Sequence, residues 1–141
     1  MTTLTLAAVL QASIIATGAN SYADARRETD DSGRPMVVLV GADWCPACVT
    51  MKNDIVPKVE RRGLLKKVAY AAVNLDHQKE LGQQLIENGP IPQVIMFRKT
   101  RDGWLRRKLI GGQNAEAVEA FINEGIKLND EAKLTAKDKA H

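Results

Sequence analysis

The chain of 141 residues is poor in aromatic side chains, in cysteine and in long apolar runs. Aromatic residues make up only 4% of it, too few for the stacked rings that bind single-stranded nucleic acid. The net charge of +3, from 20 basic and 17 acidic residues, attracts nucleic acid or an anionic membrane only weakly. No stretch approaches the roughly 20 apolar residues of a membrane-spanning helix. We therefore expect neither a nucleic-acid partner nor a stable membrane span.

The two cysteines of the chain belong to one short motif. Cys45 and Cys48 are separated by Pro46 and Ala47 and follow a valine-rich run, residues 36–40. A thiol in the first turn of a helix is favoured as thiolate by the unpaired backbone N–H groups there, and a thiol one turn later can close a disulfide with it. The spacing predicts a reversible redox pair, with Cys45 as the exposed attacking thiolate and Cys48 as the deeper resolving thiol.

Zinc binding and a pair of inert core thiols are the competing interpretations of this motif. A zinc site needs four ligands, and the remaining soft ligands, His77 and His141, have no suitable spacing to the cysteines. We therefore expect no metal site. No Gly-X-Gly-X-X-Gly segment is present to bind a dinucleotide, so we expect no cofactor and infer that electrons arrive from another protein.

Strand and helix patterns alternate along the chain. Expected helices are 22–29, 46–62, 78–88 and 115–128, and expected strands are 36–40, 68–73, 94–97 and 104–110. Pro57 should kink the second helix, Gly63 should end it, and Gly89 should be the left-handed end of the third. The basic residues 106–108 are interpreted as a solvated strand edge that discourages sheet association. The order predicts one α/β domain around a mixed sheet.

The two ends of the chain carry separate expectations. Residues 1–20 carry no charged side chain, Leu4 to Ala16 is mostly apolar, and Ala16-Thr17-Gly18 is typical of a signal-peptide cleavage site. No Lys or Arg precedes the apolar run, so an apolar extension packing on the domain is the alternative. We expect export to the periplasm or another extracytoplasmic space, with a cytoplasmic location as the alternative. The domain should span 21–128 as a monomer, and the charged segment 129–141 should be a frayed, flexible tail.

Three separated segments resemble the thioredoxin-fold family, and the resemblance covers about residues 21–128. They are the tryptophan-preceded motif at 41–48, the segment 89–93 with the family's cis-proline at Pro92, and the glycine turn at 110–112. The resemblance implies an α/β three-layer sandwich with a mixed four-stranded sheet flanked by helices. The residues at 42–45, Ala-Asp-Trp-Cys, are more similar to the motif of exported thioredoxin-like and disulfide-reductase domains than to that of cytosolic thioredoxin.

The resemblance also implies a docking surface for clients. It would consist of Trp44, Pro46, Ile91, Pro92 and Gly111 beside the cysteines, with the backbone of Ile91 free to pair with an extended substrate strand. The implied partners are proteins that contain disulfides and a protein electron donor. Simpler interpretations are a core aromatic for Trp44, an ordinary trans proline for Pro92 and a plain turn glycine for Gly111.

The chain departs from the family pattern beneath the second cysteine. Leu39 stands where thioredoxin has a buried aspartate, and Ala72 stands where it has a nearby lysine. Another group, or water, must then take the proton from Cys48. Asp43 is negatively charged and would oppose thiolate formation at Cys45, so we expect only a solvated side chain there.

Three functions compete on these grounds. We favour thiol–disulfide exchange on protein disulfides as a reductant or electron carrier. The alternatives are a peptide-binding module, such as a chaperone or assembly factor with idle cysteines, and a disulfide oxidase or isomerase that differs from the reductant only in its redox potential.

Overall fold

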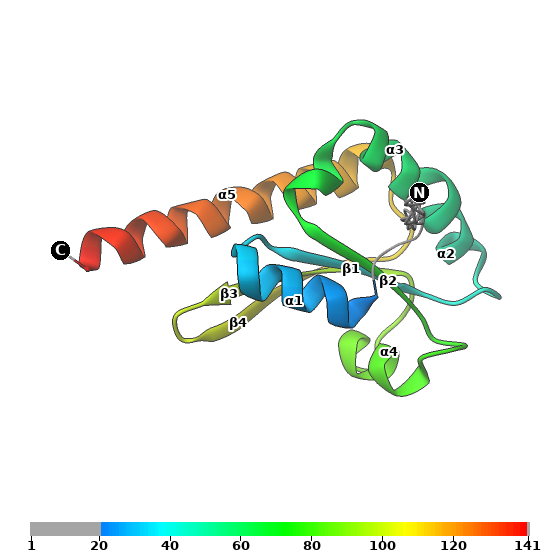
Figure 1. Ribbon diagram of the computed structural model, residues 1–141. Coiled ribbons are helices and arrows are strands. Elements are labelled where there is room, and N and C mark those ends of the chain that lie inside the picture. Colours follow the sequence, from blue (N-terminus) through cyan, green and yellow to red (C-terminus); the bar gives the residue numbers. More distant parts are fainter. Residues whose placement is uncertain (1–20, 141) are drawn as a thin grey trace, which may run out of the picture.

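The computed structural model describes residues 21–140, which fold around a mixed four-stranded sheet (Figure 1). The strands are β1 (Met36–Gly41), β2 (Ala69–Asn74), β3 (Gln93–Thr100) and β4 (Gly103–Ile110). Their order in the sheet is β2-β1-β3-β4. β1 is parallel to β2 and antiparallel to β3, and β3 and β4 form an antiparallel hairpin. The predicted signal peptide or extension, residues 1–20, lies outside the described residues.

Helices cover both faces of this sheet (Figure 1). α1 (Tyr22–Ser32) and α4 (Lys79–Ile86) pack on one face, and α5 (Ala115–Lys139) packs on the other with the helical segment that follows β1. Side chains alternate along a strand. On the central strand β1, Val38 and Val40 therefore pack on the face covered by α1 and α4, and Leu39 packs on the face covered by α5. The predicted three-layer α/β sandwich is confirmed.

The helix after β1 is interrupted near Pro57. It consists of α2 (Pro46–Thr50), a π-helical turn at Met51–Ile55 and α3 (Val56–Arg61). Proline has no N–H to donate and crowds the preceding turn, so a regular α-helix cannot run through this position unchanged. The widened turn just before Pro57 is one way in which a helix accommodates such a residue. Gly63, with φ of 82°, follows the end of the helix.

The end of α4 corrects one prediction from the sequence. The residues with left-handed backbone are Glu87 and Asn88, with φ of 53° and 56°, and not Gly89. The helix ends earlier than predicted, so the left-handed turn falls before the glycine. Gly89 serves a different purpose, because a Cβ there would lie 2.8 Å from Nε2 of Gln93 and 2.9 Å from the carbonyl oxygen of Ile86.

The last helix also differs from its predicted end. α5 continues to Lys139, so the frayed segment expected after Leu128 is wrong as a statement of secondary structure. Asn129 is buried and its Nδ2 donates a hydrogen bond of 3.1 Å to the carbonyl oxygen of Gly33, which ties this helix to the loop before β1. Further on, the alanines, lysines and Glu131 are good helix formers, and the helix extends beyond the sheet (Figure 1).

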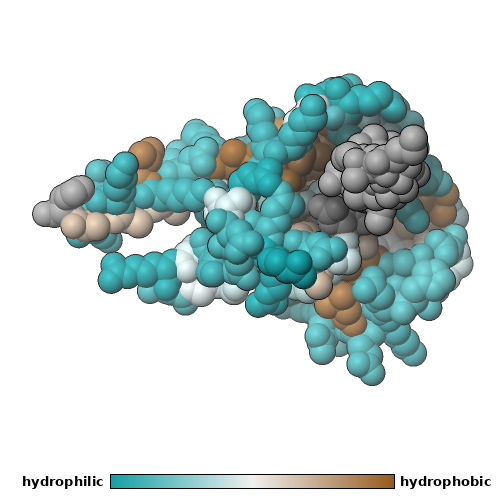
Figure 2. Space-filling view, viewed as in Figure 1, coloured by the Kyte–Doolittle hydropathy of each residue, from teal (hydrophilic) through white to brown (hydrophobic). Residues whose placement is uncertain are grey.

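The basic residues of β4 are not a solvated edge, which corrects a second prediction. Arg106 and Lys108 both pair with Glu87, and Arg107 pairs with Glu124. The three basic side chains are only 22–30% exposed. Side chains alternate along a strand, so Arg106 and Lys108 reach the end of α4 on one face of the sheet and Arg107 reaches α5 on the other. Most of the face in Figure 2 is hydrophilic, including the tip of the hairpin.

Candidate active site

The two cysteines form a disulfide at the start of α2. Cys45 is the N-cap residue of that helix and Cys48 lies in its first turn, with a Cα–Cα distance of 5.2 Å, within the range for a bonded pair. The amide of Cys48 donates a 3.3 Å hydrogen bond to Sγ of Cys45. Hydrogen bonding to a thiolate favours the charged form, so this contact would support Cys45 as the attacking sulfur after reduction.

The two cysteines differ less in exposure than the motif predicted. Cys45 is 8% exposed and Cys48 is 5% exposed, so the expectation of a freely exposed Cys45 is wrong for the oxidised form. Both pack with Ala42, and the partly buried side chains of Leu75 and Ile91 lie against this small cluster. Those two residues come from the loops after β2 and before β3, which therefore cover the disulfide from the side.

The three segments singled out in the sequence meet at this end of the sheet. The peptide bond between Ile91 and Pro92 is cis, and the carbonyl of Pro92 accepts a 2.8 Å hydrogen bond from the amide of Gly111. Gly111 has φ of 90°, a backbone conformation that glycine adopts without steric cost. A Cβ on Gly112 would lie 3.4 Å from Cβ of Ala47, so the glycine turn reaches the cysteine motif.

Two of the predicted docking residues lie at the surface beside the disulfide. Trp44 is 71% exposed, which excludes the interpretation of a core aromatic. Pro46 is exposed as well. Ile110, the residue before the glycine turn, is also half exposed at 50%. The surface around the disulfide thus carries apolar side chains that the fold itself does not bury.

A polar network that the sequence reasoning missed holds the loop before the cysteines. Nδ2 of Asn74 donates a 2.9 Å hydrogen bond to Asp43, and the amide of Asp43 donates one of 3.0 Å to Asp76. The amide of Asp76 in turn donates to the side chain of Asn74 at 2.9 Å, a local turn typical of asparagine. An Asn and an Asp two residues apart after a strand was the available signal, although it does not name Asp43 as the partner.

Gln93, which the sequence pattern did not indicate as a site residue, supports the proline turn. Gln93 is buried, and its Nε2 donates a 2.8 Å hydrogen bond to the carbonyl of Pro90. This contact spans the Ile91–Pro92 segment and restrains it from the first position of β3.

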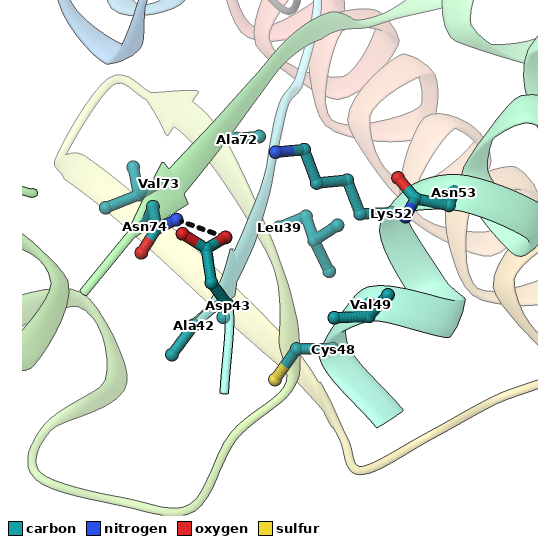
Figure 3. Close-up of a pocket in the computed structure, with 11 residues that line it drawn as sticks. Leu39, Ala42, Asp43, Cys48, Val49, Lys52, Asn53, Ala72, Val73 and Asn74 are labelled. Carbon is teal, nitrogen blue, oxygen red and sulfur yellow. Dashed lines mark hydrogen bonds between the residues drawn. The ribbon is translucent and has the colours of Figure 1, made fainter. Parts of the chain in front are cut away.

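A cleft of about 160 Å³ lies beside Cys48, between the helical segment and the ends of β1 and β2 (Figure 3). Its lining residues are Leu39, Gly41, Ala42, Asp43, Cys48, Val49, Lys52, Asn53, Ala72, Val73 and Asn74. Leu39 and Ala72, the two positions at which the chain departs from the resembled family, therefore both line this space. The carboxylate in the lining is Asp43, which Asn74 holds at the rim, while His77 lies 3.9 Å from its other oxygen.

Within residues 21–140 no group of three or more His, Cys, Asp or Glu side chains is placed to hold a metal ion. In the same part of the chain, no helix has both the length and the apolar character that crossing a membrane requires.

A CxxC disulfide at the start of a helix, on a three-layer α/β sandwich, defines a protein of the thiol–disulfide exchange class. The chain belongs to the thioredoxin-like family, whose sequence model matches residues 17–99. No curated protein sequence matches the chain at a significant level.

Solved structures of two thioredoxins and of a protein named Trxlp share the fold. The thioredoxin of Thermus thermophilus is 22% identical, with a TM-score of 0.61 over 74% of this chain and 82% of that one. Trichomonas vaginalis thioredoxin is 16% identical, with a TM-score of 0.58 over 74% and 91%. The protein Trxlp from Edwardsiella tarda EIB202 is 27% identical, with a TM-score of 0.55 over 73% of this chain and 94% of that one.

Proposed function

We propose that the protein reduces disulfides of client proteins, or carries electrons to them, through Cys45 and Cys48. The observation that carries the proposal is the Cys45–Cys48 disulfide at a site rimmed by exposed apolar side chains, Trp44 and Ile110. A redox pair needs a partner that comes close, and exposed apolar groups beside it offer that partner a contact surface. Trp44, Pro46, Ile91, Pro92 and Gly111 are the proposed docking residues.

The reaction proceeds in two exchanges once the pair is reduced. The Cys45 thiolate attacks one sulfur of the client disulfide, forms a mixed disulfide and releases the first client sulfur as a thiolate. Cys48 then loses its proton and attacks the Cys45 sulfur, which releases the second client thiolate. The two client thiolates take protons from solvent. The client gains two electrons, and the protein is left as the Cys45–Cys48 disulfide.

The surroundings of the motif support the reducing direction. A dithiol becomes a strong oxidant when its reduced, thiolate form is strongly stabilised. The dipeptide between the cysteines, Pro46-Ala47, supplies no charge and no side-chain hydrogen-bond donor, and the nearest acidic side chain in the loop, Asp43, is anionic. Apart from the backbone amide of Cys48, which donates to Sγ of Cys45, the motif therefore gives the reduced form little electrostatic stabilisation, and this favours a low potential.

The regenerating electrons come, in this proposal, from a second protein with a dithiol of its own. The sequence carries no dinucleotide-binding glycine motif, and thiol–disulfide exchange needs no bound group beyond the two cysteines.

The test is the reduction of insulin disulfides in the presence of dithiothreitol. We expect wild-type protein to accelerate it and Cys45→Ser to fall to the uncatalysed background. In a separate reaction without dithiothreitol, pre-reduced Cys48→Ser should accumulate a mixed disulfide with the client, which gel electrophoresis without reductant detects. A Cys45→Ser variant equal to wild type would instead favour a peptide-binding module with idle cysteines.

Equilibration with glutathione separates the reductant from the oxidase or isomerase. We expect a reduction potential of about −270 mV, whereas a value of about −120 mV would assign an oxidant.

We further propose that residues 1–20 direct export, on the basis of their apolar, uncharged composition. Mass spectrometry of the mature protein tests this, because export by cleavage predicts a new N-terminus after Gly18, and an intact Met1 would contradict it.

A further inference from the structure

The cleft beside Cys48 is lined by Leu39, which stands at the position of the buried aspartate of thioredoxin. Leu39 and Ala72 leave about 160 Å³ of space next to the resolving cysteine, and neither side chain can accept a proton. The second exchange of the proposed function nevertheless requires Cys48 to lose one. The cleft is therefore the part of the molecule in which the path of that proton has to be sought.

The sulfur of Cys48 is reachable from the cleft because Gly41 has no side chain. Gly41 lines the cleft, and a Cβ at this position would lie 3.1 Å from Sγ and 2.9 Å from Cβ of Cys48. Any larger residue would thus fill the space between the cleft and the sulfur. Glycine at the end of β1 keeps this passage free.

Two charged side chains, of opposite sign, line the cleft. Lys52 extends from the helical segment across Leu39 with its ammonium toward Ala72 (Figure 3). Asp43, on the loop after β1, lies on the other side and is held by Asn74. Further charged groups behind Asp43 come from the loop after β2: Asp76 accepts a hydrogen bond from the amide of Asp43, and His77 lies 3.9 Å from the Asp43 carboxylate.

We propose that Cys48 gives up its proton through this cleft and that the Lys52 ammonium stabilises the resulting thiolate, in place of a buried acid. The inference rests on the proposed function, since it concerns the second of its two exchanges. The proton passes from Sγ of Cys48 to water in the cleft and on to solvent, and the electron pair left on sulfur forms the bond to Cys45. Lys52 is a positioning residue in this scheme, because it acts by its charge and takes no proton.

The two charges predict shifts of opposite sign in the pH dependence of the second exchange. A cation in the same cleft as Cys48 lowers the pH at which the thiolate forms, and an anion there raises it. Lys52→Met should therefore raise the midpoint of the rate–pH profile by about half a pH unit, the size expected for one charge acting through partly exposed space. Lys52→Arg should restore it. Asp43→Asn should lower it.

The experiment uses reduced full-length protein and 4,4′-dithiodipyridine, an uncharged disulfide that releases a coloured thiopyridone. The first equivalent of colour reports attack by Cys45, and the second reports the attack of Cys48 on Cys45. With excess reagent the second phase is independent of reagent concentration, and its rate is measured from pH 5 to pH 10. Lys58→Met is the matched control, because Lys58 belongs to the same helical segment but pairs with Asp54 at 3.0 Å.

Ala72→Leu tests the cleft without changing any charge. Its larger side chain fills the space beside Lys52 and displaces water, so we expect the second phase to slow about tenfold while the first is unchanged. Thermal denaturation shows whether the variants fold like wild type.

The results separate the inference from the function on which it rests. Unchanged second-phase profiles in both Lys52→Met and Ala72→Leu, with a wild-type protein that releases two equivalents, would overturn the inference alone. A wild-type protein that does not accelerate insulin reduction would overturn the proposed function.

Discussion

The two ends of the sheet are built on different principles. At the end that carries the disulfide, apolar side chains such as Trp44 and Ile110 are exposed, at 71% and 50%. At the opposite end, where α1 leads into β1, polar contacts also join the elements: Asn129 of α5 donates a hydrogen bond to the carbonyl of Gly33, and Lys99 of the hairpin pairs with Asp30 of α1.

The two ends of the sheet therefore differ in role: we expect the disulfide end to bind a partner and the opposite end to stabilise the fold. Exposed apolar side chains add little to the stability of the isolated chain, and beside a disulfide they offer a contact surface to another molecule. The polar contacts at the far end join elements of the chain itself. Substitutions at the disulfide end should therefore change activity with little change in stability, and substitutions away from it should do the reverse.

The largest expected effect lies away from the disulfide, at the contact of α5 with β3. Gly125 is buried, and a Cβ there would overlap the sulfur of Met96, which is fully buried. We expect Gly125→Ala to lower the free energy of unfolding by about 2 kcal/mol, because the core must repack around the added carbon. Urea denaturation measures the loss. Insulin reduction per folded molecule should not change, and a selective loss of activity would break the comparison.

The next largest effect is expected at Trp44. Trp44→Ala should raise the KM for a protein disulfide about tenfold, equivalent to about 1.4 kcal/mol of lost contact, as is typical of an exposed tryptophan at a binding surface. Its reaction with 4,4′-dithiodipyridine and its melting temperature should stay as in wild type. Leu134→Ala is the matched control, since Leu134 is 64% exposed on the projecting end of α5. Equal effects of the two substitutions would contradict a docking role for Trp44.

A smaller effect is expected where α5 meets the loop before β1. Asn129→Leu removes the hydrogen bond to Gly33 and leaves that carbonyl without its side-chain donor, so we expect a loss of about 1 kcal/mol in stability. Removal of residues 131–141 should change stability less, because the described side chains beyond Asn129 are exposed. A truncation as damaging as the substitution would show that the projecting end of α5 has a stabilising contact of its own.

The smallest effect is expected at the ion pairs of β4. The hydrogen bond from Lys108, together with the charge of Arg106, lowers the pKa of Glu87 below that of an ordinary carboxyl group. A lowered carboxyl pKa stabilises the folded state above the pKa of the unfolded chain, and this contribution is lost as the pH falls through the folded value. The stability of wild type relative to Glu87→Gln should therefore be greater at pH 7 than at pH 3. Lys108→Gln should weaken the dependence, and a difference constant over this range would contradict it.

Local patterns made most of the fold predictable. The valine-rich strand β1, the spacing of Cys45 and Cys48, and the glycine at the end of α3 are features of a few adjacent residues, and their structural meaning does not depend on distant parts of the chain. One prediction failed because a distant contact decided the outcome. The basic residues of β4 looked like a solvated edge until α4 and α5 supplied acidic partners, Glu87 and Glu124.

The sequence by itself determined the redox pair, the α/β class and the order of the elements, because each is encoded within a short window. The tertiary structure alone decided what surrounds the sulfur atoms. Leu39, Lys52 and Ala72 come from three different elements, and only folding brings them around one cleft. Side-chain volume and charge act through distances in space, and the spacing of these residues along the chain does not contain those distances.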